Sequence, residues 1–377
     1  MKVLVLAKRF YTGKDMLNDH YGRVYELSRV LASLGHTVHG IVLDYRRSGD
    51  VRGKGCSSDG EMTWEAGRLF ANPFSGILAY LGRVNSAVAR FAPDIVLSVS
   101  DVFHIVLGDW LAAKHGLLHV VDLYDNYESF SAARLPGSVS LFRRALRRAD
   151  GIVCVSQPLA AYVTNQCRLK TKPQIIHNAV DKNLFLPRNK IACRRKLNLP
   201  KEGILVGYGG AIAASRGIDV LFQAHKDLKA VNPDIELVLA GSIDNHTKIP
   251  SNKDVHYLGE LEYAAMPEYF GSLNVGVVSN KDSNFGRYCF PQKFFEMLAC
   301  DTPIVTASTG EMPDLMKGCQ HALFRPGDVN ELVRAIRKQL DTPCRPGIEI
   351  PCWGRQGAML SEYLERVSIH ASGGKRR

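Results

Sequence analysis

The chain has 377 residues, 46% of them hydrophobic and 23% charged, and these proportions exclude a largely disordered or collagen-like chain. At roughly 100–200 residues per domain, the length predicts two domains. The formal net charge of +11 is spread over both halves, which excludes a detachable basic arm and leaves an anionic substrate, an anionic membrane surface or nucleic acid as charged partners.

Short β-branched runs alternate with stretches of helical period in the first half of the chain. The apolar run at residues 3–7 is too short for a signal peptide and predicts a buried strand. No apolar run reaches the roughly 20 residues that span a bilayer. A helix is expected over residues 21–34, closed by Gly35, and further strands are expected over residues 37–43, 94–99, 118–122 and 151–155.

The same alternation resumes after a polar, basic connector at residues 182–201. Strands are expected over residues 203–210, 235–241, 254–258, 274–278, 302–306 and 321–324, with helices at 217–232, 266–271, 294–298 and 330–340. Strands that alternate with helices form parallel sheets. The sequence therefore predicts an α/β protein with two doubly wound domains, whose ligands bind at the carboxyl ends of the strands.

Nine cysteines are scattered along the chain without a CxxC pair. This spacing argues against a disulfide framework or a zinc ribbon and is compatible with a reducing cytoplasm.

A strand that ends in Gly209 and Gly210 is followed by Arg216 at the start of a helix. Glycine lets the backbone approach a ligand, and a helix N-terminus beside an arginine favours an anion such as a phosphate. Glycines after a strand also serve turns in many α/β proteins, so this motif by itself is compatible with either interpretation.

Lys293 and Glu296 lie three residues apart on a short helix that begins after Pro291. One interpretation is a surface ion pair. The other is a ligand site, because a carboxylate at such a place can accept both hydroxyls of a ribose while the positive end of the helix faces a diphosphate.

The order of segments resembles that of the retaining GT-B glycosyltransferases of family 4 over nearly the whole chain. The matching segments are LGHTV (34–38), RADGIVCVS (148–156), IIHNAVD (175–181), RGID (216–219), VHYLG (255–259), PQKFFE (291–296) and PGD (326–328). The resemblance implies two Rossmann-like domains that face a central cleft. It implies an acceptor-binding domain over residues 1–182, a donor-binding domain over 183–352, and a C-terminal helix that crosses back, followed by a basic tail, over 353–377.

The resemblance also implies roles for residues in the second domain. Glu296 matches the second glutamate of the family's Glu–seven residues–Glu motif, which holds the ribose, and Arg216 matches the basic residue that neutralises the diphosphate, with Lys293 beside it. The donor contacts that follow are Gly22, Gly209, Gly210, Arg216, Gly259, Leu261, Tyr288, Phe290, Pro291 and Glu296.

Three positions depart from the family pattern. Tyr288 stands where the first glutamate of the motif is expected, and Ala211 stands where many members have a second phosphate-binding arginine. Asp301 replaces a glycine, and since aspartate tolerates a left-handed backbone this replacement is read as structural. Because Tyr288 replaces a carboxylate, three alternatives are open: the loop at residues 284–290 supplies other hydrogen-bond donors to the sugar, the donor sugar is unusual, or the activity is reduced.

Polar residues that follow the predicted strands of the first half are candidates for acceptor binding, since they project from the carboxyl ends of the sheet. They are Lys8, Arg9, His104, Asp122, Asp125 and Glu128. Asp125 is the candidate for a catalytic contact. A lone histidine such as His104 is more often structural than catalytic.

Arg143, Arg144, Arg147 and Arg148 lie on one predicted amphipathic helix. Such a helix can lie on anionic lipid, and it can equally be a solvated helix face. No segment matches a nucleic-acid-binding module.

The implied activity is transfer of a sugar from a nucleotide-diphosphate donor to the hydroxyl of a glycan, a lipid-linked or a small-molecule acceptor, with retention and without a metal or cofactor. Cell-envelope or polysaccharide biosynthesis in the cytoplasm is the expected setting. Two alternatives are a non-catalytic partner of a glycosyltransferase complex, suggested by Tyr288 and Ala211, and a sugar-nucleotide epimerase of the same fold.

Overall fold

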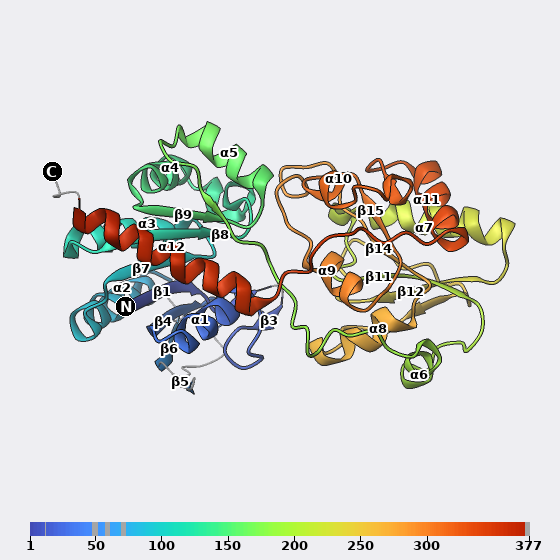
Figure 1. Cartoon of the computed structure of the whole chain (residues 1–377), viewed down its shortest axis with the longest axis horizontal. Coiled ribbons are helices and arrows are strands. Elements are labelled where there is room, and N and C mark those ends of the chain that lie inside the picture. The colour runs from blue at the N-terminus through green and yellow to red at the C-terminus, as the bar shows by residue number, and fades with distance from the viewer. Residues whose placement is uncertain (12, 47–51, 57–60, 69–72, 374–377) are drawn as a thin grey trace. The chain divides into compact units, whose positions relative to one another are not determined.

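The computed structural model describes residues 1–11, 13–46, 52–56, 61–68 and 73–373. The chain divides into two compact units (Figure 1), unit 1 being Met1–Asn178 with Trp353–Arg377 and unit 2 being Ala179–Cys352. The predicted boundary at residue 182 lies a few residues beyond the first crossing. The predicted basic tail, residues 374–377, lies outside the described residues.

Unit 1 is built on one sheet of eight strands. In spatial order they are β10 (Gln174–Ile175), β9 (Gly151–Cys154), β8 (Leu118–Leu123), β7 (Ile95–Val99), β1 (Lys2–Lys8), β4 (Thr37–Asp44), β6 (Glu61–Arg68) and β5 (Arg52–Cys56). All neighbours are parallel except β5, which pairs with β6 in antiparallel fashion. The apolar run of β1 is fully buried, as expected for a central strand with helices on both faces.

Helices cover both faces of this sheet. They are α1 (Arg23–Ser33), α2 (Pro73–Phe91), α3 (Val102–His115), α4 (Ser138–Arg148), α5 (Gln157–Cys167) and α12 (Trp353–Gly373), with short η1 (Tyr127–Ser129) and η2 (Ser131–Arg134) and a small hairpin of β2 (Phe10–Tyr11) and β3 (Lys14–Asp15). Right-handed crossovers to opposite sides of β1 place α1 and α3 on opposite faces. α4 packs between α3 and α5.

Helix α12 returns the chain to unit 1 and packs along α1, as Figure 1 shows. Gly357 permits this approach, because a Cβ atom there would lie 2.4 Å from Val30. The Tyr363 hydroxyl accepts a hydrogen bond of 2.9 Å from the backbone amide of Ile152, and the Ser361 hydroxyl lies 2.7 Å from His36 Nε2. The C-terminal helix is thus a structural part of unit 1.

Unit 2 contains a parallel sheet of six strands. Their spatial order is β13 (Val255–Tyr257), β12 (Ile235–Ala240), β11 (Ile204–Gly209), β14 (Val275–Val278), β15 (Ile304–Ala307) and β16 (Leu323–Phe324). The helices are α6 (Lys190–Lys196), α7 (Ile218–Val231), α8 (Met266–Ser272), α9 (Gln292–Ala299), α10 (Met312–Leu315) and α11 (Val329–Asp341), with short η3 (Ala214–Arg216), η4 (Tyr263–Ala265) and η5 (Gln320–Ala322). The predicted pair of parallel α/β sheets is confirmed.

Two features of unit 2 differ from expectation. The connector at 182–201 contains α6, which packs on α8, and buried Arg194 fixes it by donating to backbone carbonyls such as that of Ser272. A disulfide joins Cys319 to Cys344, although the scattered cysteines argued against disulfides. The fold brings these two residues together across 25 positions, which no local spacing reveals.

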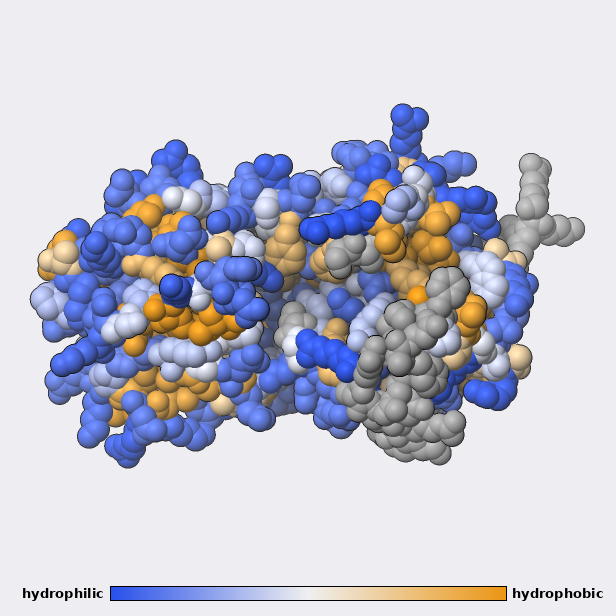
Figure 2. Space-filling view, turned by 180° about the vertical axis from the view of Figure 1, so that it is seen from behind, coloured by the Kyte–Doolittle hydropathy of each residue, from blue (hydrophilic) through white to orange (hydrophobic). Residues whose placement is uncertain are grey.

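No helix within the described residues is long and apolar enough to cross a membrane. Figure 2 views the face opposite to that of Figure 1, where hydrophobic surface occurs in patches bordered by hydrophilic side chains in both units.

Candidate functional site

The strand order of unit 2 reverses at β11. β12 lies on one side of this strand and β14 on the other, so the crossover connections leave in opposite directions and open a crevice at the carboxyl ends of the strands. Gly209 ends β11, and Gly210 follows with φ 128°. The neighbouring strand end approaches closely, since a Cβ atom at Gly241 would lie 2.0 Å from the Gly210 carbonyl oxygen.

Lys293 lies on α9, and its side chain extends to Gly210 at the end of β11. A Cβ atom at Gly210 would lie 1.5 Å from Lys293 Nζ, so no other residue at that position would leave the ammonium group where it is. Nζ also lies 5.7 Å from the ring centroid of Tyr208. Burial, together with the charge of Arg216, lowers the pKa of Lys293 to about 8.

Arg216 lies in the turn that leads from β11 to α7. Gly217 after it has φ 73° and caps the new helix at Ile218. The guanidinium carbon of Arg216 lies 4.1 Å from the ring centroid of Phe285, a cation–π contact that orients it. Two cationic side chains therefore lie near the N-terminus of α7, which is an arrangement suited to a multiply charged anion.

Glu296 lies one turn after Lys293 on α9 and is 4% exposed. Gln292 Nε2 donates a hydrogen bond of 2.9 Å to its Oε1 atom. Burial raises the pKa of Glu296 to about 7, against the opposing effects of Lys293 and of hydrogen bonds from Gln292 and Tyr263. The carboxylate is thus held in one place, and the presence of a cation favours its ionised form.

The remaining predicted donor contacts in unit 2 lie on the same edge of its sheet or around the start of α9. Gly259 has φ 72° with open space where a Cβ would lie, and Leu261 is half-buried. Phe290 stacks on Phe295 with ring centroids 5.1 Å apart. Pro291 forms the N-cap of α9, and Tyr288 is half-buried. Gly22 lies in unit 1, where it caps α1 with φ 91°.

In unit 1, polar side chains gather at the carboxyl ends of the adjacent strands β1, β7 and β8. Lys8 ends β1, Asp101 follows β7 and Asp125 follows β8. Burial lowers the pKa of Lys8, although the charges of Asp101 and Asp125 oppose this. Lys8 Nζ lies 5.2 Å from the ring centroid of Phe130. The structure thus brings two predicted acceptor residues, Lys8 and Asp125, into one polar cluster.

His104 is fully buried behind this cluster. Its Nδ1 atom lies 2.8 Å from Asp101 Oδ1, and its backbone amide donates to the same oxygen, which caps α3. Burial alone would raise the pKa of Asp101, but His104 and Lys8 hold it below its usual range. His104 therefore positions Asp101 and does not face solvent, and its contact with the acceptor stays a prediction.

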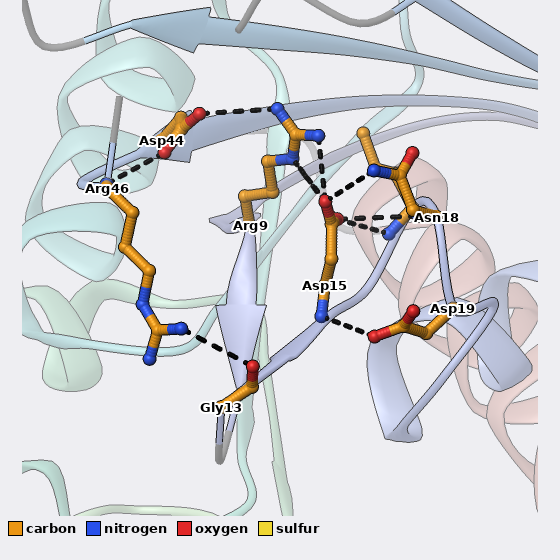
Figure 3. A network of polar contacts seen from close by, with 8 residues as sticks. Arg9, Gly13, Asp15, Asn18, Asp19, Asp44 and Arg46 are labelled. Atoms are coloured by element: carbon orange, nitrogen blue, oxygen red, sulfur yellow. Dashed lines mark hydrogen bonds and ion pairs between the residues drawn. The ribbon is translucent and has the colours of Figure 1, made fainter. Parts of the chain in front are cut away.

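Arg9, another predicted acceptor contact, is buried in an ion-pair network. It is 1% exposed, and its guanidinium donates to Asp15 at 2.8 Å and to Asp44 at 3.2 Å (Figure 3). Asp15 in turn accepts hydrogen bonds from the Asn18 side chain and from the backbone amide of Leu17. Arg9 thus folds the loop after β1 onto the sheet, and its charge is already compensated by two carboxylates.

Asp122 and Glu128 are likewise engaged in ion pairs within unit 1. Asp122 is 1% exposed, and its two carboxylate oxygens accept hydrogen bonds from Nε and Nη2 of Arg23. Glu128 accepts two hydrogen bonds from Arg143, at 2.7 and 2.8 Å, and one from the Tyr162 hydroxyl. Both carboxylates already have partners within unit 1, and their role as acceptor contacts stays a prediction.

The predicted arginine cluster forms the second half of α4. Arg143 pairs with Glu128, and Arg148 Nε lies 3.2 Å from Asp109 of α3. Arg144 and Arg147 are exposed. Only part of the cluster is therefore a free basic surface.

Several residues of the two clusters were not predicted. Gln292 lies one turn before Glu296 on α9, a spacing that could have indicated the hydrogen bond. Asp101 belongs to a polar segment after a predicted strand, and what was not predicted is that it caps α3. Phe285 and Tyr263 carry no such local signal, since they reach Arg216 and Glu296 from other segments.

Two family profiles match successive parts of the chain. Glycosyltransferase Family 4 matches residues 23–184, and Glycosyl transferases group 1 matches residues 203–342. The chain belongs to the group 1 glycosyltransferases of family 4. The glycine end of β11 and the Lys293–Glu296 pair lie within the range that the second profile matches.

Curated relatives of this glycosyltransferase are distant. A D-inositol 3-phosphate glycosyltransferase of Stackebrandtia nassauensis is 29% identical over 186 residues, which cover 44% of this chain and 40% of the relative. A GDP-mannose-dependent monoacylated alpha-(1-6)-phosphatidylinositol monomannoside mannosyltransferase of Corynebacterium glutamicum is 23% identical over 225 residues, 56% of this chain and 58% of the relative. The chain matches about half the length of these relatives.

Solved structures resemble the glycosyltransferase over nearly its whole length. Sucrose-phosphate synthase of Thermosynechococcus elongatus has a TM-score of 0.69 at 18% identity, covering 99% of this chain and 97% of that one. Anabaena HepE in complex with UDP-glucose has a TM-score of 0.68 at 16% identity, covering 99% and 100%. At these identities the likeness establishes the shared GT-B fold.

Proposed function

We propose that this glycosyltransferase transfers a sugar from a nucleotide-diphosphate donor to a hydroxyl group, with retention at the anomeric carbon and without a metal ion. The observation that carries the proposal is the convergence of Arg216, Lys293 and Glu296 at the switch point of unit 2. The crystal structure of HepE with UDP-glucose, which has the same fold, adds support for a nucleotide-sugar donor.

In this proposal Arg216 and Lys293 act on the leaving group. The diphosphate gains negative charge as the glycosidic bond breaks, and catalysis requires that this charge be stabilised more in the transition state than in the bound donor. Two fixed cations beside the N-terminus of α7 meet this requirement. Gly210 leaves the space in which the ammonium group of Lys293 lies.

Glu296 binds the ribose of the donor in this proposal. A carboxylate can accept hydrogen bonds from two neighbouring hydroxyls, and charge-assisted bonds of this kind are the stronger ones. The raised pKa of Glu296 means that donor binding must stabilise its ionised form. Gln292 and Tyr263 hold the carboxyl group in place. The base and the sugar of the donor are proposed to lie toward Gly259, Leu261, Tyr288, Phe290 and Pro291.

The acceptor hydroxyl belongs, in this proposal, to a glycan, a lipid-linked or a small-molecule acceptor that meets Lys8 and Asp125 of unit 1. Both residues lie at the strand ends where ligands of such sheets bind. Polysaccharide or cell-envelope biosynthesis in the cytoplasm is the proposed setting.

The proposal is tested with the full chain and a panel of UDP-, GDP-, ADP- and dTDP-sugars, by thermal shift and by donor hydrolysis or transfer. A ligand at a hundred times its dissociation constant stabilises by about 2.7 kcal/mol. Glu296→Gln should weaken binding of the best donor, and Glu202→Gln, at an exposed position of unit 2, should not. Binding without any turnover would instead support a non-catalytic partner, and failure to bind any of the four classes would contradict the proposal.

A further inference from the structure

The disulfide between Cys319 and Cys344 has no role in the proposed transfer reaction. Cys319 directly precedes η5 and is 1% exposed, whereas Cys344 follows α11 and is half-buried. The proposed setting of the enzyme is the cytoplasm, where disulfides are rare and those that form are mostly transient, catalytic or redox-sensing. A disulfide in such a protein therefore calls for an explanation beyond stability.

Cys344 fixes the chain after α11 to the rest of unit 2. Besides the disulfide, its backbone amide donates a hydrogen bond of 3.0 Å to Gln339 Oε1, and its carbonyl accepts one of 2.8 Å from Gln339 Nε2. Gln339 lies on α11, is fully buried and also donates to the carbonyl of Ile304 in β15 at 3.1 Å. The disulfide adds a covalent link to these hydrogen bonds, and it is the part of the arrangement that a reductant can remove.

Arg345, the residue after Cys344, contacts the end of α9. Its Nη2 atom donates a hydrogen bond of 2.9 Å to the carbonyl of Leu298 in the last turn of this helix, and its Nη1 atom donates one of 2.5 Å to Asp301. The last carbonyls of a helix have no partner within it and carry partial negative charge, so an arginine at this place caps the helix. Helix α9 has only eight residues, among them Lys293 and Glu296.

The segment of residues 343–346 is not held by close packing alone. A cavity of about 160 Å³ is lined by this segment together with residues 298 and 301–304. Side chains that line a void lose the dispersion contacts of a packed core. The ion pair of Arg345 and Asp301 is about half exposed, so it contributes little by itself. The position of Arg345 at the end of α9 therefore depends on how firmly Cys344 is fixed.

We propose that the Cys319–Cys344 disulfide is a site of thiol–disulfide exchange with a dithiol reductant, and that its oxidised form stabilises α9 and strengthens binding of the nucleotide donor. Arg345 is the positioning residue that connects the disulfide to the helix. The inference rests on the proposed function, because α9 carries two of the proposed donor contacts. It adds to that function a dependence of donor affinity on the redox state of the enzyme.

Reduction proceeds in two exchange steps. A thiolate of the dithiol attacks the sulfur of Cys344, the more accessible of the two cysteines, forms a mixed disulfide with it and displaces Cys319 as a thiolate. The second thiol of the reductant then attacks its own sulfur in the mixed disulfide and displaces Cys344. Two electrons and two protons pass to the protein, which ends with two thiols, and the reductant ends as a disulfide.

Amide hydrogen exchange of the full-length protein without a ligand tests the connection to α9. Reduction with dithiothreitol should speed exchange at least threefold in peptides that cover residues 296–302, because the last turn of α9 loses a firmly held cap. Peptides that cover β11 should exchange as before. Cys319→Ala/Cys344→Ala should exchange like the reduced wild type and should not respond to dithiothreitol.

Calorimetric titration with the best donor of the nucleotide-sugar panel tests the effect on the donor site. Reduction should weaken the affinity about three- to tenfold, which is the contribution expected of a charged helix cap. Arg345→Gln should weaken the oxidised protein by the same factor and should remove the response to dithiothreitol. The matched control is Arg325→Gln, which removes an exposed arginine paired with Asp328 and Glu331 and should keep both the affinity and the response.

Three outcomes would overturn the proposal. They are unchanged exchange of α9 on reduction, a donor affinity that stays the same or rises on reduction, and a response to dithiothreitol that persists in Arg345→Gln. Each of them leaves the proposed function standing, since the oxidised wild type still binds its donor. If no donor of the panel binds, the proposed function fails, and the exchange measurement still decides whether reduction of the disulfide reaches α9.

Discussion

The ammonium group of Lys293 occupies the space that a side chain at position 210 would fill. A Cβ atom built on Gly210 lies 1.5 Å from Lys293 Nζ and 2.6 Å from its Cε. Gly210 also has φ 128°, a conformation that residues with a side chain rarely adopt. The glycine at the end of β11 thus determines where the cation of α9 lies.

Gly210→Ala should therefore displace Lys293 and strain the backbone at the end of β11. We expect binding of the nucleotide donor to weaken at least tenfold, with a lower melting temperature of the free protein. Gly347→Ala is the matched control, since Gly347 has open space and no left-handed φ. Calorimetric titration measures the affinity, and unchanged donor affinity in Gly210→Ala would contradict the role given to Lys293.

Donor affinity should depend on pH with a maximum between about 7 and 8. The ribose needs ionised Glu296, whose pKa is raised to about 7, so affinity falls as the pH drops below that value. The diphosphate needs protonated Lys293, whose pKa is lowered to about 8, so affinity falls again at higher pH. Titrations across this range measure both limbs, and Glu296→Gln should remove the acidic one. A flat profile would contradict the assignment.

The free energy of unfolding of the free protein should also depend on the titration of Glu296 and Lys293, and the two groups should change it in opposite directions as the pH rises. The folded pKa of Glu296 lies above its ordinary value of 4.5, so its contribution is favourable at low pH and is lost as the pH rises from about 4.5 to about 7. The folded pKa of Lys293 lies below 10.5, so stability is lost as the pH falls from about 10.5 to about 8. Unfolding in denaturant, compared between wild type and Glu296→Gln, should show the first effect as a difference that grows toward neutral pH.

Lys8 and Asp125 should affect the acceptor without affecting the donor. Lys8→Met and Asp125→Asn each remove a charged group from the cluster in unit 1, so we expect kcat/KM for transfer to fall by about ten- to a hundredfold. Donor binding to the free enzyme should stay unchanged, since Arg216, Lys293 and Glu296 lie in unit 2. Lys182→Met, at an exposed position, is the control. A loss of donor affinity equal to the loss of transfer would argue against this assignment.

The ion pair of Arg23 and Asp122 should be essential for stability. Nε and Nη2 of the arginine lie 2.8 and 2.9 Å from the two carboxylate oxygens, and a third donor binds the carbonyl of His177 at 3.0 Å. Asp122→Asn leaves a buried arginine uncompensated, and we expect a loss of about 3–5 kcal/mol in the free energy of unfolding. Asp314→Asn, in the exposed pair with Lys317, should leave denaturant unfolding almost unchanged. Equal effects of the two substitutions would mean that burial of the pair contributes little.

The disulfide between Cys319 and Cys344 should protect unit 2 from unfolding. It closes a loop of 25 residues, and the chain-entropy model assigns such a cross-link about 3.5 kcal/mol. Reductant should therefore lower the denaturant midpoint of the wild type and have no effect on Cys319→Ala/Cys344→Ala. Mass spectrometry after alkylation in denaturant counts the free cysteines. Labelling of all nine cysteines without reductant would show that the bond is absent.

Helix α9 shows which features of the site could be predicted from the sequence. Pro291 at its start and the spacing of Lys293 and Glu296 predict one charged helix face, because helical periodicity is a local property of the chain. The approach of Lys293 to Gly210 depends on how α9 packs over β11, and no local pattern contains that distance. The strands could be predicted as well, because burial on both faces of a parallel sheet requires continuous apolar runs. Such runs are also a local property of the chain.

The length of the chain and the alternation of its apolar runs with helical stretches predict two α/β domains, and its composition gives a surplus of positive charge. It did not determine which charges are free. Arg9, Asp122 and Glu128 are polar residues after strands, as acceptor contacts would be, yet each is held by a partner far away in the sequence or on another element. Only the tertiary structure decides this, because the partners of a buried charge are set by which elements pack together, whereas residue type and spacing are set by the chain alone.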